Sequence, residues 1–161
     1  MYQAESKLPT DLDFYLWLND DVVLYSDAIQ NALKLAIEMP NSVIVGKVCD
    51  PVTKEVTYGG LERMGRNPLR VKLIENKYEN IEVTTFNGNF VLIPRNIHDL
   101  VGRIDGDFSH GFADLDYGYR VRKQCFNIYL LRTPVGSCST DRKSTRLNSS
   151  HEWISRMPSS A

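Results

Sequence analysis

Two short, mostly apolar runs with one helical pattern between them constrain the fold more than any other feature. The runs are Phe14–Leu18, which is continuously apolar, and Ser42–Cys49, and runs of this kind are typical of a strand buried on both faces. Ser26 is the predicted N-cap of a helix that lies between them and ends before Pro40. The apolar residues at helical spacing in that helix are Ile29, Leu33, Ala36 and Ile37. A strand, a helix and a strand in this order predict the α/β class.

The middle of the chain is rich in strand patterns. Asn87-Gly88, between the apolar segments 81–86 and 89–93, predicts a β-hairpin. The alternation of apolar and basic residues in 69–73 predicts a half-exposed strand. The other predicted elements are strands at 56–58 and 126–131, helices at 95–100 and 113–124, and a Gly- and Asp-rich loop at 102–111. We therefore expect a mixed sheet flanked by helices, in one domain that covers residues 1–138.

Composition argues against several classes of partner and compartment. The 161 residues carry a formal net charge of −1, which predicts no nucleic-acid partner. No apolar run approaches the length of a bilayer span, and no signal peptide is recognised. Cys49, Cys125 and Cys138 match neither a zinc pattern nor a disulfide framework, so a reducing, cytoplasmic compartment is expected. The Ser- and Arg-rich segment 139–161 is predicted to be a disordered or non-native tail.

The tripeptide Asn19-Asp20-Asp21 interrupts an otherwise apolar stretch. A buried carboxylate is costly unless it is paired or coordinates a metal, so these residues are expected at the end of the strand Phe14–Leu18. One interpretation is an ordinary exposed turn, because Asp and Asn favour turns. The other is a divalent-cation site, because Mg²⁺ and Mn²⁺ prefer oxygen ligands, and α/β sheets place ligands beyond the carboxyl ends of their strands. The spacing alone leaves both interpretations open.

A second group of carboxylates lies at the start of the predicted helix 113–124. Asp114 and Asp116 fall in its first turn, where the helix dipole favours an ionised carboxylate, and Arg120 is spaced for an ion pair with Asp116. The group reads either as a positioned general base or as the ordinary acidic preference of a helix start. His110 lies in the preceding loop and is expected to face a ligand. The segment from Asp105 begins like a calcium-binding EF-hand loop, but His110 occupies the position that needs Gly, so calcium is disfavoured.

Six segments in a fixed order resemble a known family. They are LNDD, VIVG, TYGG, FNGNFVLIPR, VGRIDGDFSHGF and ADLDYGYRVRKQ. Between residues 13 and 138 the chain is similar to the later part of a family 2 glycosyltransferase of the GT-A fold, and in particular to bacterial members that build surface polysaccharides. The resemblance implies a GT-A-like mixed sheet and a transferase that moves a sugar from a nucleotide-diphosphate sugar to an acceptor hydroxyl with inversion.

The resemblance also implies a role for each segment. Asn19, Asp20 and Asp21 match the family's Asp-x-Asp motif, in which Asp21 would hold the Mg²⁺ or Mn²⁺ that bridges the diphosphate. Asp114 matches the base that deprotonates the acceptor hydroxyl, and Ala113 stands where the family has Glu.

Further substrate contacts are expected from the same comparison. Asp116 and Arg120 resemble positions that shape the donor and acceptor site, and Asn87, Gly88 and Asn89 resemble a segment that returns to the catalytic pocket. The expected partners are a nucleotide-sugar donor and a saccharide or lipid-linked saccharide acceptor, and the expected location is the cytoplasm or the inner face of the membrane.

The chain departs from the family pattern in two ways. Cys125 stands where the family commonly has Gly at the helix end, which predicts local strain. The family's nucleobase-binding strands would precede Phe14, so we expect a piece of a longer enzyme, in which Phe14–Leu18 lacks a neighbour on one side. The piece alone is expected to be poorly soluble and inactive. The alternatives are an inactive or non-catalytic carbohydrate-binding module and a two-carboxylate glycoside hydrolase.

Overall fold

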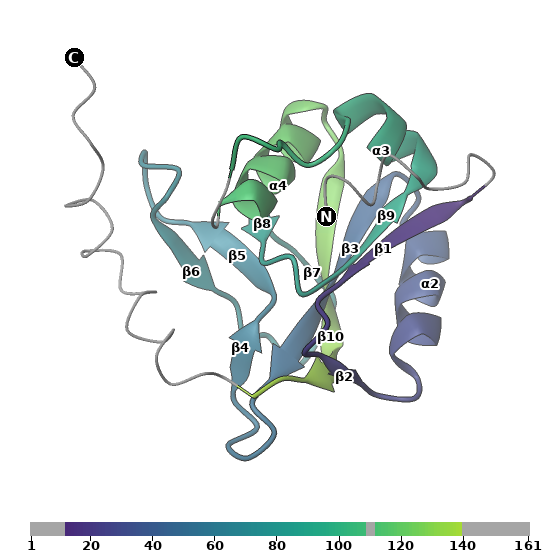
Figure 1. The fold of residues 1–161 in the computed structure, drawn as a ribbon, viewed down its shortest axis with the longest axis vertical. Helices are drawn as coiled ribbons and strands as arrows, with labels where there is room; N and C mark the ends of the chain where they lie inside the picture. Colours follow the sequence, from purple (N-terminus) through teal and green to yellow (C-terminus); the bar gives the residue numbers. More distant parts are fainter. Residues whose placement is uncertain (1–11, 109–111, 140–161) are drawn as a thin grey trace.

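A computed structural model describes residues 12–108 and 112–139 of the chain (Figure 1). The helices are α2 (Ala28–Glu38), α3 (Arg95–Val101) and α4 (Ala113–Lys123). The strands are β1 (Phe14–Leu18), β2 (Val23–Leu24), β3 (Ser42–Cys49), β4 (Val56–Tyr58), β5 (Gly60–Arg63), β6 (Val71–Leu73), β7 (Ile81–Glu82), β8 (Thr85–Phe86), β9 (Phe90–Pro94) and β10 (Asn127–Ser137). Residues 140–161 of the predicted tail 139–161, and His110, lie outside the described residues. Within those ranges, no helix has the length and apolar character needed to cross a membrane.

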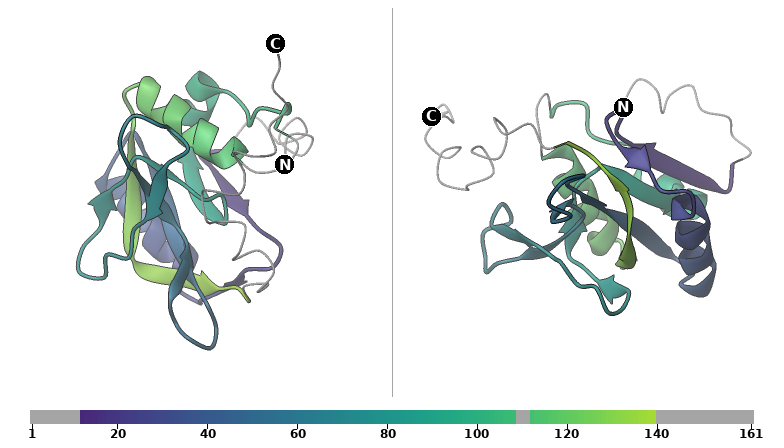
Figure 2. Two further views of the ribbon diagram at one scale, coloured as in Figure 1. Left: turned by 90° about the vertical axis from the view of Figure 1, so that its left-hand side faces the viewer. Right: turned by 90° about the horizontal axis from the view of Figure 1, so that it is seen from below.

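The strands form two sheets. The larger sheet has the order β1-β9-β3-β10-β2, with β4 paired to β3 and β7 paired to β10. Its β3–β10 pair is parallel and its other pairs are antiparallel. The smaller sheet has the order β6-β5-β8, and Figure 2 shows it on the opposite side of the molecule from α2. This arrangement confirms the predicted α/β class with a mixed sheet.

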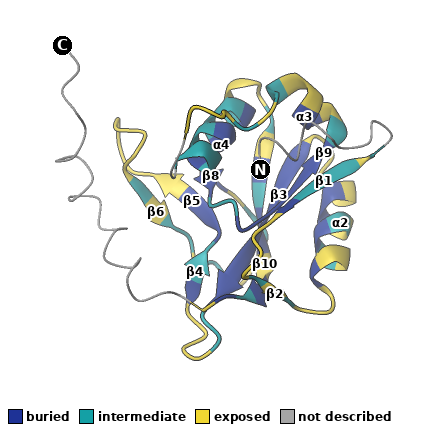
Figure 3. Cartoon of the chain, in the orientation of Figure 1, coloured by how far each residue is buried: buried dark blue, intermediate teal, exposed yellow. Residues whose placement is uncertain are grey.

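Strand β3 forms the centre of the core, as its mostly apolar sequence predicts. All eight of its residues are buried, and Figure 3 shows the buried residues concentrated in β3 and its neighbour β9. Val43 and Val45 pack in the cluster that includes residues of α3 and α4. Ile44 and Val48 pack in the cluster that includes residues of α2. Because alternate residues of a strand point to opposite faces, helices cover both faces of this sheet.

Strand β1 differs from its prediction. Only Trp17 is buried among its five residues, and Leu18 is 39% exposed. The strand is exposed because it lies at the edge of the sheet, where it pairs with β9 and with no second strand among the described residues. The expectation of burial on both faces is therefore wrong, whereas the expectation of an open strand edge is confirmed for the described part of the chain.

Helix α2 presents to the sheet a face that matches the predicted one only in part. Of the four residues predicted at helical spacing, Ala36 is buried and Leu33 packs against the core. It begins at Ala28 with Asp27 at the N-cap, so the prediction of Ser26 as the cap is wrong. Ile29 and Ile37 are 45% and 75% exposed, and they do not contribute to the buried face. The residues of the helix that are buried are Ala28, Ala32, Leu35 and Ala36. Small alanine side chains let the helix approach the sheet closely, and this packing outweighs the burial that the two isoleucines would gain.

Asn87-Gly88 is not a hairpin turn, although its sequence predicts one. Strand β8 pairs with β5 in the small sheet, whereas β9 pairs with β1 and β3 in the large sheet. The segment therefore connects the two sheets. Pairing with distant strands has overridden the local turn preference, and it carries Gly88 to the start of α4.

The end of α4 contains the strain that the sequence predicts. Cys125 follows the C-cap residue Gln124 and has φ 62°, in the left-handed region. This conformation costs a non-glycine residue about 1–2 kcal/mol.

We expect Cys125→Gly to raise the free energy of unfolding by about 1 kcal/mol, because glycine adopts this conformation without a Cβ clash. The measurement is urea denaturation, with Cys125→Ala as the control for loss of the thiol. If Cys125→Ala raises the free energy of unfolding as much as Cys125→Gly does, the effect comes from loss of the thiol and not from the backbone conformation.

Candidate functional site

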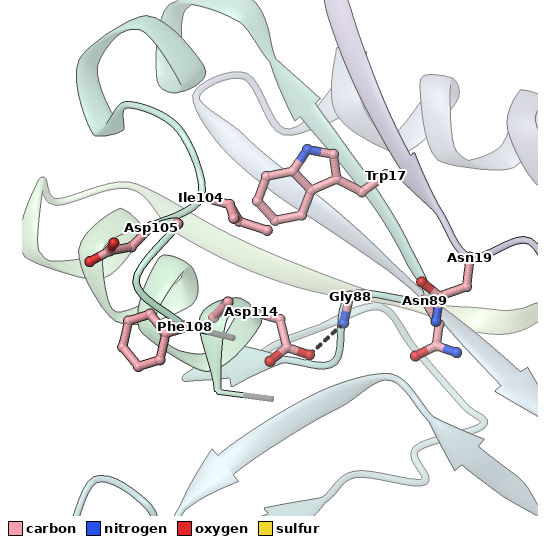
Figure 4. Close-up of a pocket in the computed structure, with 10 residues that line it drawn as sticks. Trp17, Asn19, Gly88, Asn89, Ile104, Asp105, Phe108 and Asp114 are labelled. Atoms are coloured by element: carbon pink, nitrogen blue, oxygen red, sulfur yellow. Dashed lines mark hydrogen bonds between the residues drawn. The ribbon is translucent and has the colours of Figure 1, made fainter. Parts of the chain in front are cut away.

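A cavity of about 350 Å³ lies where the end of β1, the segment 87–89, the loop after α3 and the start of α4 meet (Figure 4). Its lining residues are Trp17, Asn19, Gly88, Asn89, Ile104, Asp105, Gly106, Phe108, Ala113 and Asp114. Four of the predicted site residues, Asn19, Gly88, Asn89 and Asp114, are thus brought together from three separate stretches of sequence. The structure supports the expectation that these stretches converge.

The pairing of β1 with β9 places the two asparagines. Leu18 is paired with Phe90, and just beyond this pair the backbone N–H of Asn19 donates to the carbonyl of Asn89 at 3.2 Å. Both residues therefore lie at the same end of the strand pair, on the cavity wall. Their side-chain amides give the wall donors and acceptors that carry no charge.

Asp114 is the most strongly positioned carboxylate of the cavity. Its Oδ2 accepts a hydrogen bond from the backbone N–H of Gly88 at 2.9 Å (Figure 4). Its Oδ1 accepts one from the N–H of Leu115 at 2.9 Å. Burial raises the pKa of Asp114 above its ordinary value, and the backbone hydrogen bonds oppose that rise only in part. A carboxylate with a raised pKa and a fixed orientation is suited to accept a proton from a ligand hydroxyl.

The raised pKa of Asp114 predicts how stability depends on pH. The native state holds the proton more tightly than the unfolded state, so this group's contribution favours folding at low pH and is lost as the pH rises from about 3.8 through the raised pKa. Asparagine does not titrate, so Asp114→Asn should not lose stability as the pH rises through this range. We therefore expect the free energy of unfolding of the variant, minus that of the parent, to be greater at neutral pH than near pH 4. Urea denaturation of both proteins across this range measures the difference, and a pH-independent difference would contradict it.

The packing beneath the cavity holds α4 close to the small sheet. The hydroxyl of Thr85 in β8 donates to the carbonyl of Leu115 at 3.0 Å. A Cβ on Gly118 would lie 2.2 Å from that hydroxyl oxygen, so only glycine allows this approach. Trp17 packs edge-on against Tyr117 of the same helix, with ring centroids 4.5 Å apart. The helix that carries Asp114 is therefore fixed against both sheets.

Asn19-Asp20-Asp21 forms a turn. The N–H of Val22 donates to the carbonyl of Asn19 at 3.3 Å, and the three residues are exposed. The turn interpretation is confirmed in its geometry, and Asp20 and Asp21 do not line the cavity.

Asp21 has a buried neighbour. Its Oδ2 lies 3.1 Å from Sγ of Cys138, which donates to it. Burial first, and then the hydrogen bond to Asp21, raise the pKa of Cys138 to about 11, so the thiol remains a donor at neutral pH. One oxygen of this exposed carboxylate is therefore held by the thiol.

The chemistry of this turn fits a hard cation, although the geometry does not form a closed site. The described residues contain no cluster of three or more His, Cys, Asp or Glu side chains that could hold a metal ion. Carboxylates of Asp20 and Asp21 and the amide oxygen of Asn19 are nevertheless the donor types that Mg²⁺ and Mn²⁺ take, and such ions commonly bind through one or two carboxylates and substrate phosphates.

The remaining predicted residues lie around the cavity instead of lining it. Asn87 donates its backbone N–H to the carbonyl of Gly59 at 2.9 Å. Asp116 and Arg120 form the predicted ion pair, with Nε to Oδ2 at 2.7 Å. The lining residues that the sequence did not place in this site are Trp17, Ile104, Asp105, Gly106 and Phe108. Trp17 was predicted only as part of a buried strand. The other four belong to the loop 102–111, where Asp105 was considered only for a disfavoured calcium site and His110 alone was expected to face a ligand.

Comparisons with known proteins identify no family for this chain. No protein-family model matches it, and no curated protein is significantly similar to it. The fold and the site thus define a mixed α/β protein with a cavity at a strand end, in which one partly buried carboxylate accepts two backbone hydrogen bonds.

Proposed function

We propose that this sequence forms the acceptor-activating part of an inverting, metal-dependent glycosyltransferase of the GT-A type. The observation that carries the proposal is the Asp114 carboxylate, which lines the cavity and is held there by the N–H groups of Gly88 and Leu115. The order of segments that resembles family 2 glycosyltransferases agrees with it, because the residue matched to the family's base is the one that lies in the cavity.

The proposed reaction is a single displacement. Asp114 takes the proton of an acceptor hydroxyl, and the oxygen attacks the anomeric carbon of the donor sugar. The bond from that carbon to the diphosphate breaks, the nucleoside diphosphate leaves with the electron pair, and the anomeric configuration inverts. The raised pKa of Asp114 brings its basicity closer to the working pH, which makes proton transfer more effective.

Asn19 and Asn89 support the same chemistry from the opposite wall. Their amides supply uncharged donors and acceptors to sugar hydroxyls, and they do so beside a carboxylate. Asp20 and Asp21 would hold Mg²⁺ or Mn²⁺, which when bound supplies positive charge to the leaving diphosphate. In this proposal the turn serves the donor and the cavity serves the acceptor.

The test is release of nucleoside diphosphate from UDP-, GDP- and dTDP-sugars with Mn²⁺ and simple saccharide acceptors. The assay uses the longest polypeptide that contains the sequence, with the chain itself beside it. We expect Asp21→Ala to abolish Mn²⁺-dependent donor binding, whereas the exposed carboxylate variant Glu55→Ala leaves it unchanged. Donor turnover without a divalent cation would contradict the metal-dependent mechanism, and saccharide binding without any turnover would favour a non-catalytic carbohydrate-binding module.

A further inference from the structure

Arg120 makes more interactions than its predicted role requires. Its side chain is 29% exposed, and Nε donates to the Asp116 carboxylate at 2.7 Å. Nη1 donates to the carbonyl of Val101 at 2.9 Å, and Nη2 donates to the carbonyl of Arg103 at 3.0 Å. The guanidinium carbon also lies 4.9 Å from the ring centroid of Tyr117. Each of its three nitrogens thus donates within the protein.

The two carbonyl groups lie where α3 ends and the cavity wall begins. Val101 is the last residue of α3, and Gly102 follows it with φ 84°, so the helix stops abruptly there. The carbonyls at a helix end lack intrahelical partners, and a cation is a favourable donor to them. The next residues, Ile104, Asp105 and Gly106, line the cavity.

Asp114 lies on the same helix as Arg120 and lines the same cavity. Arg120 therefore connects the helix that carries the proposed base to the loop that supplies Ile104, Asp105 and Gly106 to the cavity wall. Tyr117, beneath the guanidinium, packs against Trp17, which also lines the cavity. One side chain thus links three parts of the cavity's boundary.

We infer that Arg120 is a positioning residue that holds the loop 102–108 against α4 and thereby sets the shape of the cavity, without touching the ligand itself. This differs from the direct substrate role that the family resemblance implies for Arg120. A lysine cannot replace it, because a single ammonium group cannot present a planar fork to one carboxylate and two carbonyls. Any effect of Arg120 on catalysis rests on the proposed function, whereas its hold on the loop 102–108 does not.

The test uses Trp17 as a reporter of the cavity wall. The chain has two tryptophans, so Trp153→Phe leaves Trp17, which is 5% exposed, as the single fluorophore. In this background we expect Arg120→Met and Arg120→Lys each to increase acrylamide quenching of Trp17 roughly twofold or more, because the loop opens locally. The matched control is Arg122→Met. Arg122 lies on the same helix, but it pairs with Glu82 and bonds to Asn127, and not to the loop.

Each outcome decides the inference without any transferase assay. Greater quenching in both Arg120 variants, with the Arg122 variant equal to the parent, supports it. If Arg120→Met does not fold, as judged by circular dichroism, Arg120→Lys carries the test. If acrylamide quenches Trp17 in Arg120→Lys no more than in the parent, the inference is overturned, because a positive charge alone would then hold the loop 102–108 against α4. Equal quenching in the Arg120 and Arg122 variants would also overturn it. A failure of the proposed function appears separately, as absent turnover with quenching as expected here.

Discussion

Asp114→Asn is expected to lower the turnover of glycosyl transfer by about 10²–10⁴-fold, the usual contribution of a positioned general base. The amide oxygen of asparagine can still accept the N–H of Gly88, so the helix start and the cavity wall keep their geometry. The amide cannot take a proton from the acceptor hydroxyl, so the loss falls on turnover more than on binding. The measurement is the rate of nucleoside diphosphate release at saturating donor and acceptor.

The matched control is Asp107→Asn. It makes the same change of charge in the loop 102–108, but Asp107 is exposed and does not line the cavity. We expect its turnover to equal that of the parent. A variant at Asp114 that alters only the free energy of unfolding would contradict the role of base, and it would favour the non-catalytic interpretation.

Gly118→Ala is expected to lower the free energy of unfolding by about 2–3 kcal/mol, within the range for overpacking a close contact. The added Cβ would lie 2.2 Å from Oγ1, 2.9 Å from Cβ and 3.0 Å from Cα of Thr85. The last of these atoms belongs to the backbone, so no rotation of the threonine side chain relieves the clash. Helix α4 must move away from β8, and the hydrogen bond from Thr85 to Leu115 is lost. Urea denaturation measures the effect.

Two further variants isolate the cause. At Gly88 an added Cβ would meet the nearest atom of Asp114 at 3.4 Å, an ordinary contact, so Gly88→Ala is expected to change stability by less than about 0.5 kcal/mol. Combining Gly118→Ala with Thr85→Ala removes the hydroxyl but not the backbone contact, so the double variant should be more stable than the sum of the single effects predicts. Strict additivity of the two changes would show that the helix and the strand do not interact as described.

Local pattern determined several elements of this protein. Strand β3 has the predicted ends, and α4 begins at the predicted residue and ends one residue early. These features depend on short-range periodicity and on turn and capping chemistry. The family resemblance, and not local pattern, predicted the strain at Cys125 and the place of Gly88 and Asn89 beside the site, whereas Asn19 and Asp114 were also indicated by their positions at a strand end and a helix start.

Only the tertiary structure decided how those elements meet. The Asn87-Gly88 segment connects the two sheets, because β8 pairs with β5 in one sheet and β9 pairs with β1 and β3 in the other. The buried face of α2 was set by how closely its alanines approach the sheet; the sequence offers helical spacing both to these residues and to Ile29 and Ile37, and only packing chose between them. Arg120 bonds to carbonyls 17 and 19 residues earlier in the chain. Pairing, close packing and such bonds join residues distant in sequence, so they depend on the whole fold, whereas the elements themselves depend on their own few residues.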